Sequence, residues 1–180
     1  SSNVKVRVSD DEASRNLLVR DTSTQAFRII GKLVVTKPVN TDVLEIDKPF
    51  TLEWMKYGSV ANAKIQYSTD GSNWTTIEES WPNAAGVYTT YQWTPINPDA
   101  VTTHGYIRVL DAAGVGLGDD SDEFRIKGWY EFAAGNHPQL NEVWKVGVQQ
   151  TITWTKHGNI QYAKIDYTHR TGGSAKGNFA

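Results

Sequence analysis

Acidic residues provide the most suggestive chemistry in this sequence. The run 119–123 reads Asp-Asp-Ser-Asp-Glu, and Asp111 lies upstream of it. Carboxylate oxygens are the hard ligands that Ca²⁺ prefers, so this cluster is a candidate calcium site. The spacing is not that of an EF-hand loop, and the alternative is a solvated hairpin loop whose acids prevent pairing at a sheet edge. The candidate calcium ligands are Asp111, Asp119, Asp120 and Asp122. A similar cluster stands near the start of the chain and consists of Asp10, Asp11, Glu12 and Asp21.

Asn73 begins Asn73-Trp74-Thr75, the one Asn-x-Ser/Thr sequon of the sequence. It follows the turn signal Asp70-Gly71, where a glycan would be attached at the surface of a secreted protein. Sequons also arise by chance, so Asn73 is a candidate glycosylation site and an unmodified turn is the alternative.

Other chemistry-bearing residues lack the patterns of an active site. The glycines of the run 114–118 have neither the spacing nor the strand-to-helix context of a phosphate loop, which favours a turn. The four histidines have no metal-ligand spacing, and we expect each to lie at the surface or in a loop. No G-x-S-x-G elbow accompanies the serines, so the chain is predicted not to be an enzyme.

The tryptophans Trp81 and Trp129 either stack on a sugar or, as we expect, cover junctions between repeats, since Trp129 follows the boundary glycine Gly128.

Composition excludes several classes of partner. The 180 residues carry a net charge of −2, which gives no electrostatic case for binding nucleic acid or an anionic membrane. Cysteine is absent, which excludes disulfides and thiolate metal sites. No apolar run is long enough to span a bilayer, so membrane insertion is not expected.

An internal repeat is the strongest signal in the sequence. Residues 51–69 and 151–169 align without a gap at an offset of 100 and are identical at 8 of 19 positions. Residues 6–10 resemble 107–111, and 27–31 resemble 124–128. The predicted organisation is therefore the closing half of a first repeat, a complete repeat and the opening half of a third, which suggests a fragment of a longer protein. The predicted boundaries are 1–31, 32–128 and 129–180.

Period-2 alternation of apolar and polar residues runs through the complete repeat, as half-buried antiparallel strands require. Turn signals separate the segments, and no window shows an apolar stripe at helical spacing. The predicted strands are 33–36, 43–46, 50–55, 62–68, 74–78, 88–94, 104–110 and 122–127. This pattern predicts an all-β chain of tandem immunoglobulin-like or fibronectin-III-like antiparallel β-sandwich repeats of about 100 residues. Trp54 and Trp154 are expected at equivalent buried positions, as are Tyr67 and Tyr167.

The third repeat also contains a recognisable motif. Residues 143–147 read Val-Trp-Lys-Val-Gly and 151–154 read Thr-Ile-Thr-Trp. This resembles the W-x-V-G-x-x-x-x-I-x-W opening of an extracellular module found in fungal Ser/Thr-rich wall-anchored proteins and in bacterial surface proteins. In the middle repeat, Leu44 stands in place of Trp144 and Asp47 in place of Gly147. The resemblance implies an extracellular setting, a structural or adhesive role and no catalytic residue.

The expected function is that of a non-catalytic structural region of a secreted or cell-surface protein, such as an S-layer or stalk component. An adhesin or a carbohydrate-binding module of a larger secreted hydrolase is the alternative. Calcium is the one candidate cofactor. The expected partners are neighbouring repeats or other copies of the chain, with cell-wall glycan as a further candidate. Because 1–31 carries closing strands and 129–169 carries opening ones, the two ends are expected to complete each other between molecules.

Overall fold

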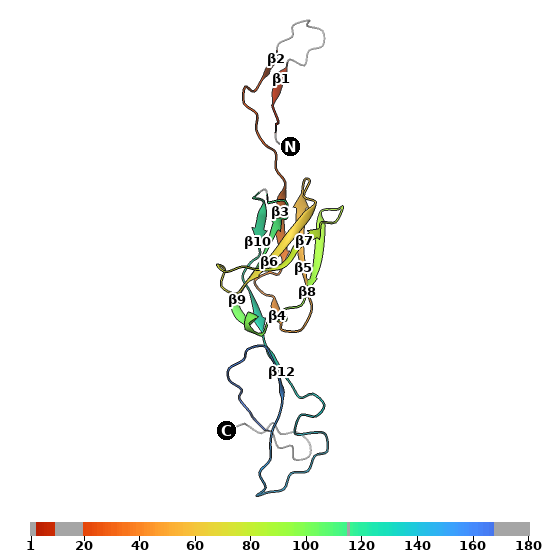
Figure 1. The fold of residues 1–180 in the computed structure, drawn as a ribbon, viewed down its shortest axis with the longest axis vertical. Coiled ribbons are helices and arrows are strands. Elements are labelled where there is room, and N and C mark those ends of the chain that lie inside the picture. Colours follow the sequence, from red (N-terminus) through yellow and green to blue (C-terminus); the bar gives the residue numbers. More distant parts are fainter. Residues whose placement is uncertain (1–2, 10–19, 115, 168–180) are drawn as a thin grey trace.

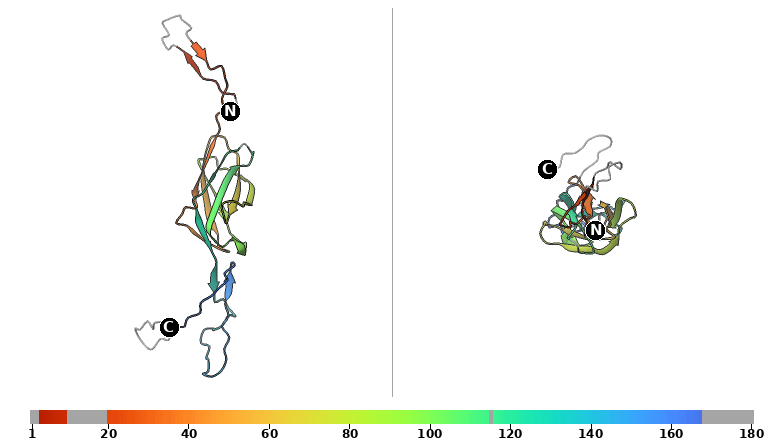
Figure 2. Two further views of the ribbon diagram at one scale, coloured as in Figure 1. Left: turned by 90° about the vertical axis from the view of Figure 1, so that its left-hand side faces the viewer. Right: turned by 90° about the horizontal axis from the view of Figure 1, so that it is seen from above.

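The computed structural model describes residues 3–9, 20–114 and 116–167, and within these ranges the chain is all-β. Two facing sheets, in the arrangement of a β-sandwich, occupy the middle of an elongated molecule (Figure 1). Residues 3–9 and 20–31 extend from one end of this sandwich and residues 129–167 from the other (Figure 2). The one helical element described is a 3₁₀ turn, η1 (Pro98–Ala100), so the described residues contain no helix that could cross a membrane.

The strands are short. They are β1 (Arg7–Ser9), β2 (Arg20–Thr22), β3 (Lys32–Lys37), β4 (Val43–Glu45), β5 (Phe50–Tyr57), β6 (Asn62–Ser68), β7 (Thr75–Pro82), β8 (Tyr88–Trp93), β9 (Thr102–Asp111), β10 (Gly118–Asp120), β11 (Phe124–Lys127), β12 (Trp129–Glu131) and β13 (Thr155–His157).

The middle region contains two sheets. One has the order β4-β11-β9-β6-β7, with β10 also paired to β9, and the other has the order β3-β5-β8. Neighbouring strands are antiparallel except β4 and β11, which run parallel. Outside the sandwich, β1 pairs with β2 and β12 pairs with β13, both antiparallel.

The core lies between the two sheets. Trp54 on β5 is fully buried, and its indole N–H donates to Asn83 Oδ1 at 2.7 Å, so the one polar atom of the ring is satisfied. Side chains of both sheets surround it, because alternate residues of each strand point to the same face. The buried apolar residues are Leu33, Leu44, Ile46, Leu52, Trp54, Val60, Ala63, Ile65, Trp93, Ala100, Ile107, Val109, Phe124 and Ile126.

All eight predicted strands of the middle region are present within a few residues of their predicted bounds. The structure adds one strand that was not predicted, β10, which no alternation in the sequence indicated. Its residues are Gly118, Asp119 and Asp120, which have low β-propensity. Backbone pairing with β9 holds this strand, and Asp119 Oδ2 accepts a hydrogen bond from the Val35 backbone N–H at 2.9 Å, which ties β10 to β3 of the other sheet.

The same local geometry occurs in the N-terminal segment and in the middle region. Val6 N–H donates to Ser23 Oγ at 3.2 Å, and Ser23 N–H donates to the Val6 carbonyl at 2.8 Å. The corresponding distances between Ile107 and Ser121 are 3.0 and 2.8 Å. Residues 3–9 and 20–31 therefore resemble the part of the sandwich made by β9, β10 and β11.

A second recurrence links the middle region to the C-terminal segment. The first residue of β3, Lys32, is opposite Tyr57, and the first residue of β12, Trp129, is opposite His157. In each case a glycine precedes the first strand and another follows the second strand. The pair β12-β13 thus repeats the start of the β3-β5 pairing.

A third recurrence is a turn closed by an acidic side chain. Val39 N–H donates to Asp42 Oδ2 at 2.8 Å, and Asp42 N–H donates to the Val39 carbonyl at 2.9 Å. One hundred residues later, Gln139 N–H donates to Glu142 Oε2 at 2.7 Å, and Glu142 N–H donates to the Gln139 carbonyl at 3.1 Å. The two acids accept the same bond at equivalent places in the chain.

Burial was expected for all four aromatic residues of the repeat; it is confirmed for Trp54 alone and is wrong for Tyr167. Trp54 is fully buried and Tyr67 is half-buried, whereas Trp154 is half-buried and Tyr167 is 88% exposed. The reason is physical: among the described residues, 129–167 contribute one strand pair, and no second sheet covers its apolar side chains.

Trp54→Ala should lower the free energy of unfolding of the sandwich by about 3–5 kcal/mol, because it removes the largest buried side chain of the core. Urea denaturation followed by circular dichroism measures this loss. Trp74→Ala is the matched control, since Trp74 stacks on Arg108 outside the core and should cost at most about 1.5 kcal/mol. Equal losses for the two variants would contradict the assigned core.

The carboxyl group of Glu142 should have a pKa well below the usual range of a glutamate. The Trp144 indole N–H, the Gln139 backbone N–H and His137 lower the pKa of Glu142 from 4.5 to about 2. These contacts stabilise the turn fully above pH about 4.5, and their contribution is lost as the pH falls toward 2. The indole N–H resonance of Trp144, followed by NMR, should therefore titrate with a midpoint near 2. A midpoint near 4.5, or a titration that persists in Glu142→Gln, would contradict the contact.

Candidate functional site at the junction after Lys127

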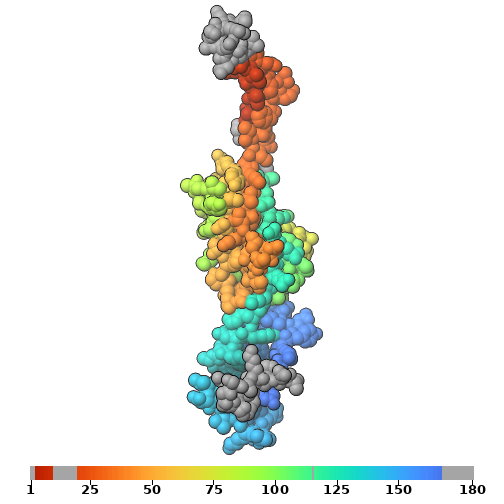
Figure 3. Space-filling view, turned by 180° about the vertical axis from the view of Figure 1, so that it is seen from behind, coloured from red at the N-terminus to blue at the C-terminus, as the bar shows by residue number. Residues whose placement is uncertain are grey.

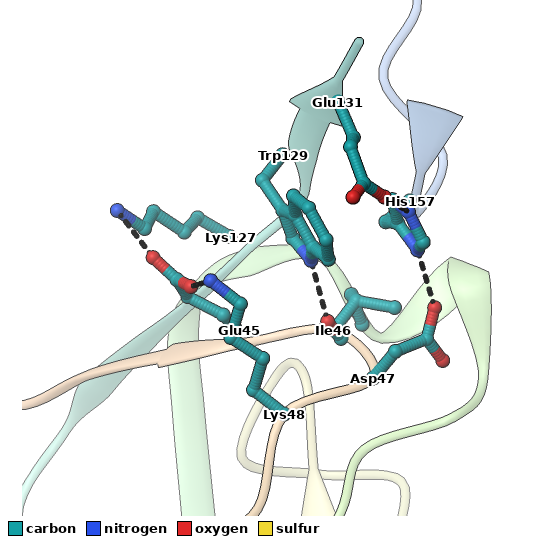
Figure 4. A network of polar contacts seen from close by, with 8 residues as sticks. All are labelled: Glu45, Ile46, Asp47, Lys48, Lys127, Trp129, Glu131 and His157. Atoms are coloured by element: carbon teal, nitrogen blue, oxygen red, sulfur yellow. Dashed lines mark hydrogen bonds and ion pairs between the residues drawn. The ribbon is translucent and has the colours of Figure 1, made fainter. Parts of the chain in front are cut away.

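The best-organised cluster of polar and aromatic side chains joins the sandwich to the C-terminal segment (Figure 4). Trp129, the first residue of β12, lies directly after Gly128. Its indole N–H donates to the Ile46 carbonyl at 2.7 Å, which ties β12 to the loop between β4 and β5. The Trp129 ring stacks on His157 of β13, with centroids 3.8 Å apart and planes 2° from parallel. The ammonium of Lys48 lies 4.4 Å from the centre of the Trp129 ring, a cation–π distance.

His157 lies between two carboxylates. Its Nδ1 is 2.8 Å from Asp47 Oδ2, in the β4–β5 loop, and its Nε2 is 3.4 Å from Glu131 Oε2 on β12. An imidazolium donates from both nitrogens, whereas a neutral imidazole donates from one and accepts at the other. The Asp47 contact is the polar side-chain link between the sandwich and β13.

Asp47 adopts a backbone conformation that favours glycine. Its φ is 63°, and at the equivalent position of the C-terminal segment Gly147 has a φ of 81°. A residue with a Cβ is disfavoured in this region, although Asp tolerates it better than most. The Asp47 side chain contacts His157, which a glycine at this position could not do.

Two glycines allow the backbones to approach closely at the junction. A Cβ built on Gly128 would collide with the His157 carbonyl, and one built on Gly158 would lie 3.1 Å from the Gly128 Cα. Gly158 also has a φ of +88°. The other end of the sandwich has the same arrangement, because a Cβ on Gly31 would lie 2.6 Å from the Tyr57 carbonyl and one on Gly58 3.2 Å from the Gly31 Cα. The two pairs of glycines, one at each end of the sandwich, therefore share one backbone geometry.

The residue after Gly158 fastens the C-terminal segment to η1. Asn159 N–H donates to the Pro98 carbonyl at 2.8 Å, and its side-chain amide donates to Asp99 Oδ1 at 3.0 Å. Together with Asp47 and Ile46, these contacts hold the segment at two separate loops of the sandwich. A segment held at two points resists bending relative to the sandwich in more directions than a segment held at a single point.

Lysines and a glutamate border the junction. Glu45 pairs with Lys127 at 2.9 Å and also with Lys48. Hydrogen bonds from Lys48 and Lys127 lower the pKa of Glu45 below its usual value. Because Lys48 also lies over Trp129, Glu45 helps to orient that lysine toward the ring.

The candidate calcium ligands are not brought together. Asp119 accepts from Val35, Asp120 makes a bidentate pair with Arg108 at 2.6 and 2.7 Å, and Asp111 accepts from the Ala113 N–H. The Asp122 side chain is exposed. In the part of the chain that the structure describes, no three His, Cys, Asp or Glu side chains form a metal-binding group. The alternative, a solvated loop whose acids prevent edge pairing, does not describe this segment either, because Gly118–Asp120 form β10 and pair with β9. Of the similar N-terminal cluster, residues 10–12 lie outside the described ranges.

Asn73 lies on the exposed turn between β6 and β7, as expected for a modifiable residue. Its side-chain N–H donates to Asp70 Oδ2 at 2.7 Å, while the Ser72 and Asn73 backbone N–H groups donate to Asp70 Oδ1, both at 2.8 Å. Bonds from Asn73, Ser72 and Ser68 lower the pKa of Asp70 well below its usual value. Asn73 thus lies on an exposed turn, and the nitrogen that would carry a glycan is hydrogen-bonded to Asp70.

The two tryptophans predicted to cover junctions differ. Trp129 does so, whereas Trp81 does not. Trp81 meets Tyr91 of β8 edge to face at 4.9 Å and donates to the Thr90 carbonyl at 3.2 Å, so it closes the edge between the two sheets. The prediction for Trp81 is wrong because its strand, β7, extends along this edge up to Pro82.

Sequence reasoning missed His157 and Asp47. His157 was expected to be a simple surface or loop residue, but its side chain is about one-fifth exposed and holds the junction. The available signal was the aspartate at position 47, since Gly147 stands 100 residues later in the aligned sequence. The other described histidines have carboxylate contacts, His104 to Glu123 and His137 to Glu142, each at 3.0 Å.

In comparisons with known proteins, no protein-family model and no curated protein matches the chain.

Asp47→Gly should raise the stability of the sandwich and lower the rigidity of the junction. The variant removes a left-handed aspartate, so the sandwich should become more stable by up to about 1 kcal/mol, while His157 loses its partner in the β4–β5 loop. Thermal melting measures the first effect. Electron-resonance distances between spin labels at introduced cysteines on β7 and β12 measure the second, and their distribution should broaden.

Asp47→Asn is the matched control. Asparagine adopts the left-handed region readily and still bonds to His157, so the label distribution should remain narrower than in Asp47→Gly. An unchanged, narrow distribution in Asp47→Gly would show that the aspartate does not hold the junction.

Proposed function

We propose that this chain is a run of tandem immunoglobulin-like or fibronectin-III-like β-sandwich repeats with a non-catalytic, structural role. The observation that carries the proposal is that the same close approach of two backbone segments occurs twice, with Gly31 against Gly58 and Gly128 against Gly158. The recurring Ser23 and Ser121 contacts and the recurring acid-closed turns support the same division of the chain. Repeats joined in this way contact their neighbours along one axis.

The junction supports a stiff structural role. Lys127 and Trp129 are separated by a single glycine, and the side chains around them bind two loops of the sandwich. A flexible linker would instead be rich in Gly and Ser and would leave such loops without contacts. We propose that the repeats form a stiff rod, as in a stalk or an S-layer arm, in a secreted or cell-surface protein.

Two further observations support an extracellular setting. The segment 143–154 resembles the opening of an extracellular module, and Asn73 presents its amide on an exposed turn. The proposed location is the cell surface or cell wall, where neighbouring repeats and cell-wall glycan are the proposed contacts.

Surface labelling of producing cells tests this proposal. Antibodies raised against the purified chain should label intact cells, and protease added outside should remove the label, because a stalk or surface layer is accessible without permeabilisation. A cytosolic protein serves as the control and should be labelled only after permeabilisation. Label that appears only after permeabilisation would contradict a surface role.

A further inference from the structure

A cleft opens along the side of the sandwich where its two sheets end. β7 is an edge strand of one sheet and β8 an edge strand of the other. Trp81 closes one stretch of this side, and further along the strands the gap is a cleft of about 330 Å³. All residues that line it belong to the sandwich, the widest part of the molecule in Figure 3, and none to either extension. The sandwich alone therefore sets the shape of the cleft.

The cleft combines aromatic rings with neutral polar groups. Its aromatic rings are those of Tyr67, Tyr91 and Trp93, and the rings of Tyr67 and Trp93 have centroids 5.1 Å apart and planes inclined by 38°. None of the described residues that line the cleft carries a charge. Its polar side chains include those of Thr76, Gln92, Thr94 and Asn97.

The indole N–H of Trp93 is a donor without an acceptor. Trp93 is 7% exposed, whereas the buried Trp54 and the neighbouring Trp81 both donate their indole N–H to an oxygen. Every fully buried polar side-chain atom of the described residues has a hydrogen-bond partner, so the unpartnered N–H of Trp93 must be accessible. Because Trp93 lines the cleft, this donor opens into it. A ligand oxygen placed there would satisfy an otherwise wasted donor.

The backbone of β8 supplies a further donor and acceptor. Successive residues of an antiparallel strand point their N–H and C=O groups to opposite sides. The Val87 carbonyl accepts from Lys56 on β5, and the Thr90 carbonyl accepts from Trp81 on β7. Gln92, two residues after Thr90, therefore points its backbone groups away from β5, at the open side where it lines the cleft. A peptide strand could not add along this side, because Trp81 already occupies the Thr90 carbonyl.

We propose that this cleft binds the terminal sugar ring of a neutral glycan. A pyranose ring has an apolar C–H face that packs on aromatic rings, and its hydroxyl groups both donate and accept hydrogen bonds. The N–H groups of Trp93 and Gln92 donate to the sugar, and the Gln92 carbonyl accepts from it. The absence of charge among the lining residues disfavours a charged ligand, whose charge would be left unpaired.

The size of the cleft limits the ligand. Small-molecule sites have volumes of about 300–1,000 Å³, so this cleft lies at the lower end and suits one ring, with the rest of the glycan outside. The inference deepens the proposed contact with cell-wall glycan, on which it rests, by naming the site and the part of the glycan that enters it.

Titration with neutral trisaccharides tests the site. Trisaccharides of glucose, mannose and N-acetylglucosamine are added separately to the purified chain, and the indole N–H resonances are followed by NMR. At least one sugar should shift the Trp93 resonance and saturate with a Kd of about 1 mM or lower. The Trp74 resonance should stay in place, because that ring stacks on Arg108 outside the cleft. A trisaccharide of galacturonic acid should not bind, since the cleft has no cation for its carboxylates.

Two variants test the contacts. Trp93→Phe keeps a ring and removes the N–H, so the affinity should fall about three- to tenfold. Tyr91→Phe removes one hydroxyl at the cleft and should weaken binding about two- to fivefold, which keeps the test decisive if Trp93→Phe does not fold. Tyr88→Phe, on the same strand but exposed outside the cleft, is the matched control and should bind like the parent.

Three results would overturn the inference. They are the absence of saturable binding by all three neutral sugars, equal shifts of the Trp74 and Trp93 resonances, and an affinity that the two cleft variants change no more than Tyr88→Phe does. None of these results would alter the surface labelling of cells, so failure of the sugar site and failure of the proposed function can be told apart.

Discussion

A β-sheet with one apolar face is stable in water only when a second layer covers that face, and this constraint governs the whole molecule. In the middle region, β3, β5 and β8 cover the apolar face of β6, β9 and β11, so Trp54 and Phe124 are both buried. Neither extension contains both layers among its described residues. Many of their apolar side chains are exposed, and the sequence of each extension resembles part of the covered unit.

Alternation of apolar and polar residues was sufficient to predict most strands, because each has one buried face. Leu52 and Trp54 on β5 and Ile107 and Val109 on β9 are clear cases. β10 escaped prediction because backbone pairing, rather than its side chains, holds it in place. The exposure of Tyr167 was equally invisible, because burial depends on the layer that faces a residue and a residue's own strand carries no information about that layer.

The candidate site was partly predictable. Trp129 was correctly placed at a junction from its position after Gly128, but its partner His157 contacts Asp47, which is 110 residues distant, and no local pattern encodes such a pairing. For the acidic residues, closeness in the sequence wrongly suggested a shared site. Asp119 and Asp120 are adjacent in sequence, yet alternation along β10 directs one toward Val35 and the other toward Arg108, so neighbouring carboxylates are satisfied by different partners.

The two glycine crossings share a backbone but carry different side chains. Lys32 and Tyr57 occupy at one end the places that Trp129 and His157 occupy at the other. These positions lie outside the buried core of the sandwich. In the proposed rod, the stiffness of a joint is therefore set independently of core packing, and the rod can be straight in one stretch and compliant in another, with the difference set by two amino acids per joint.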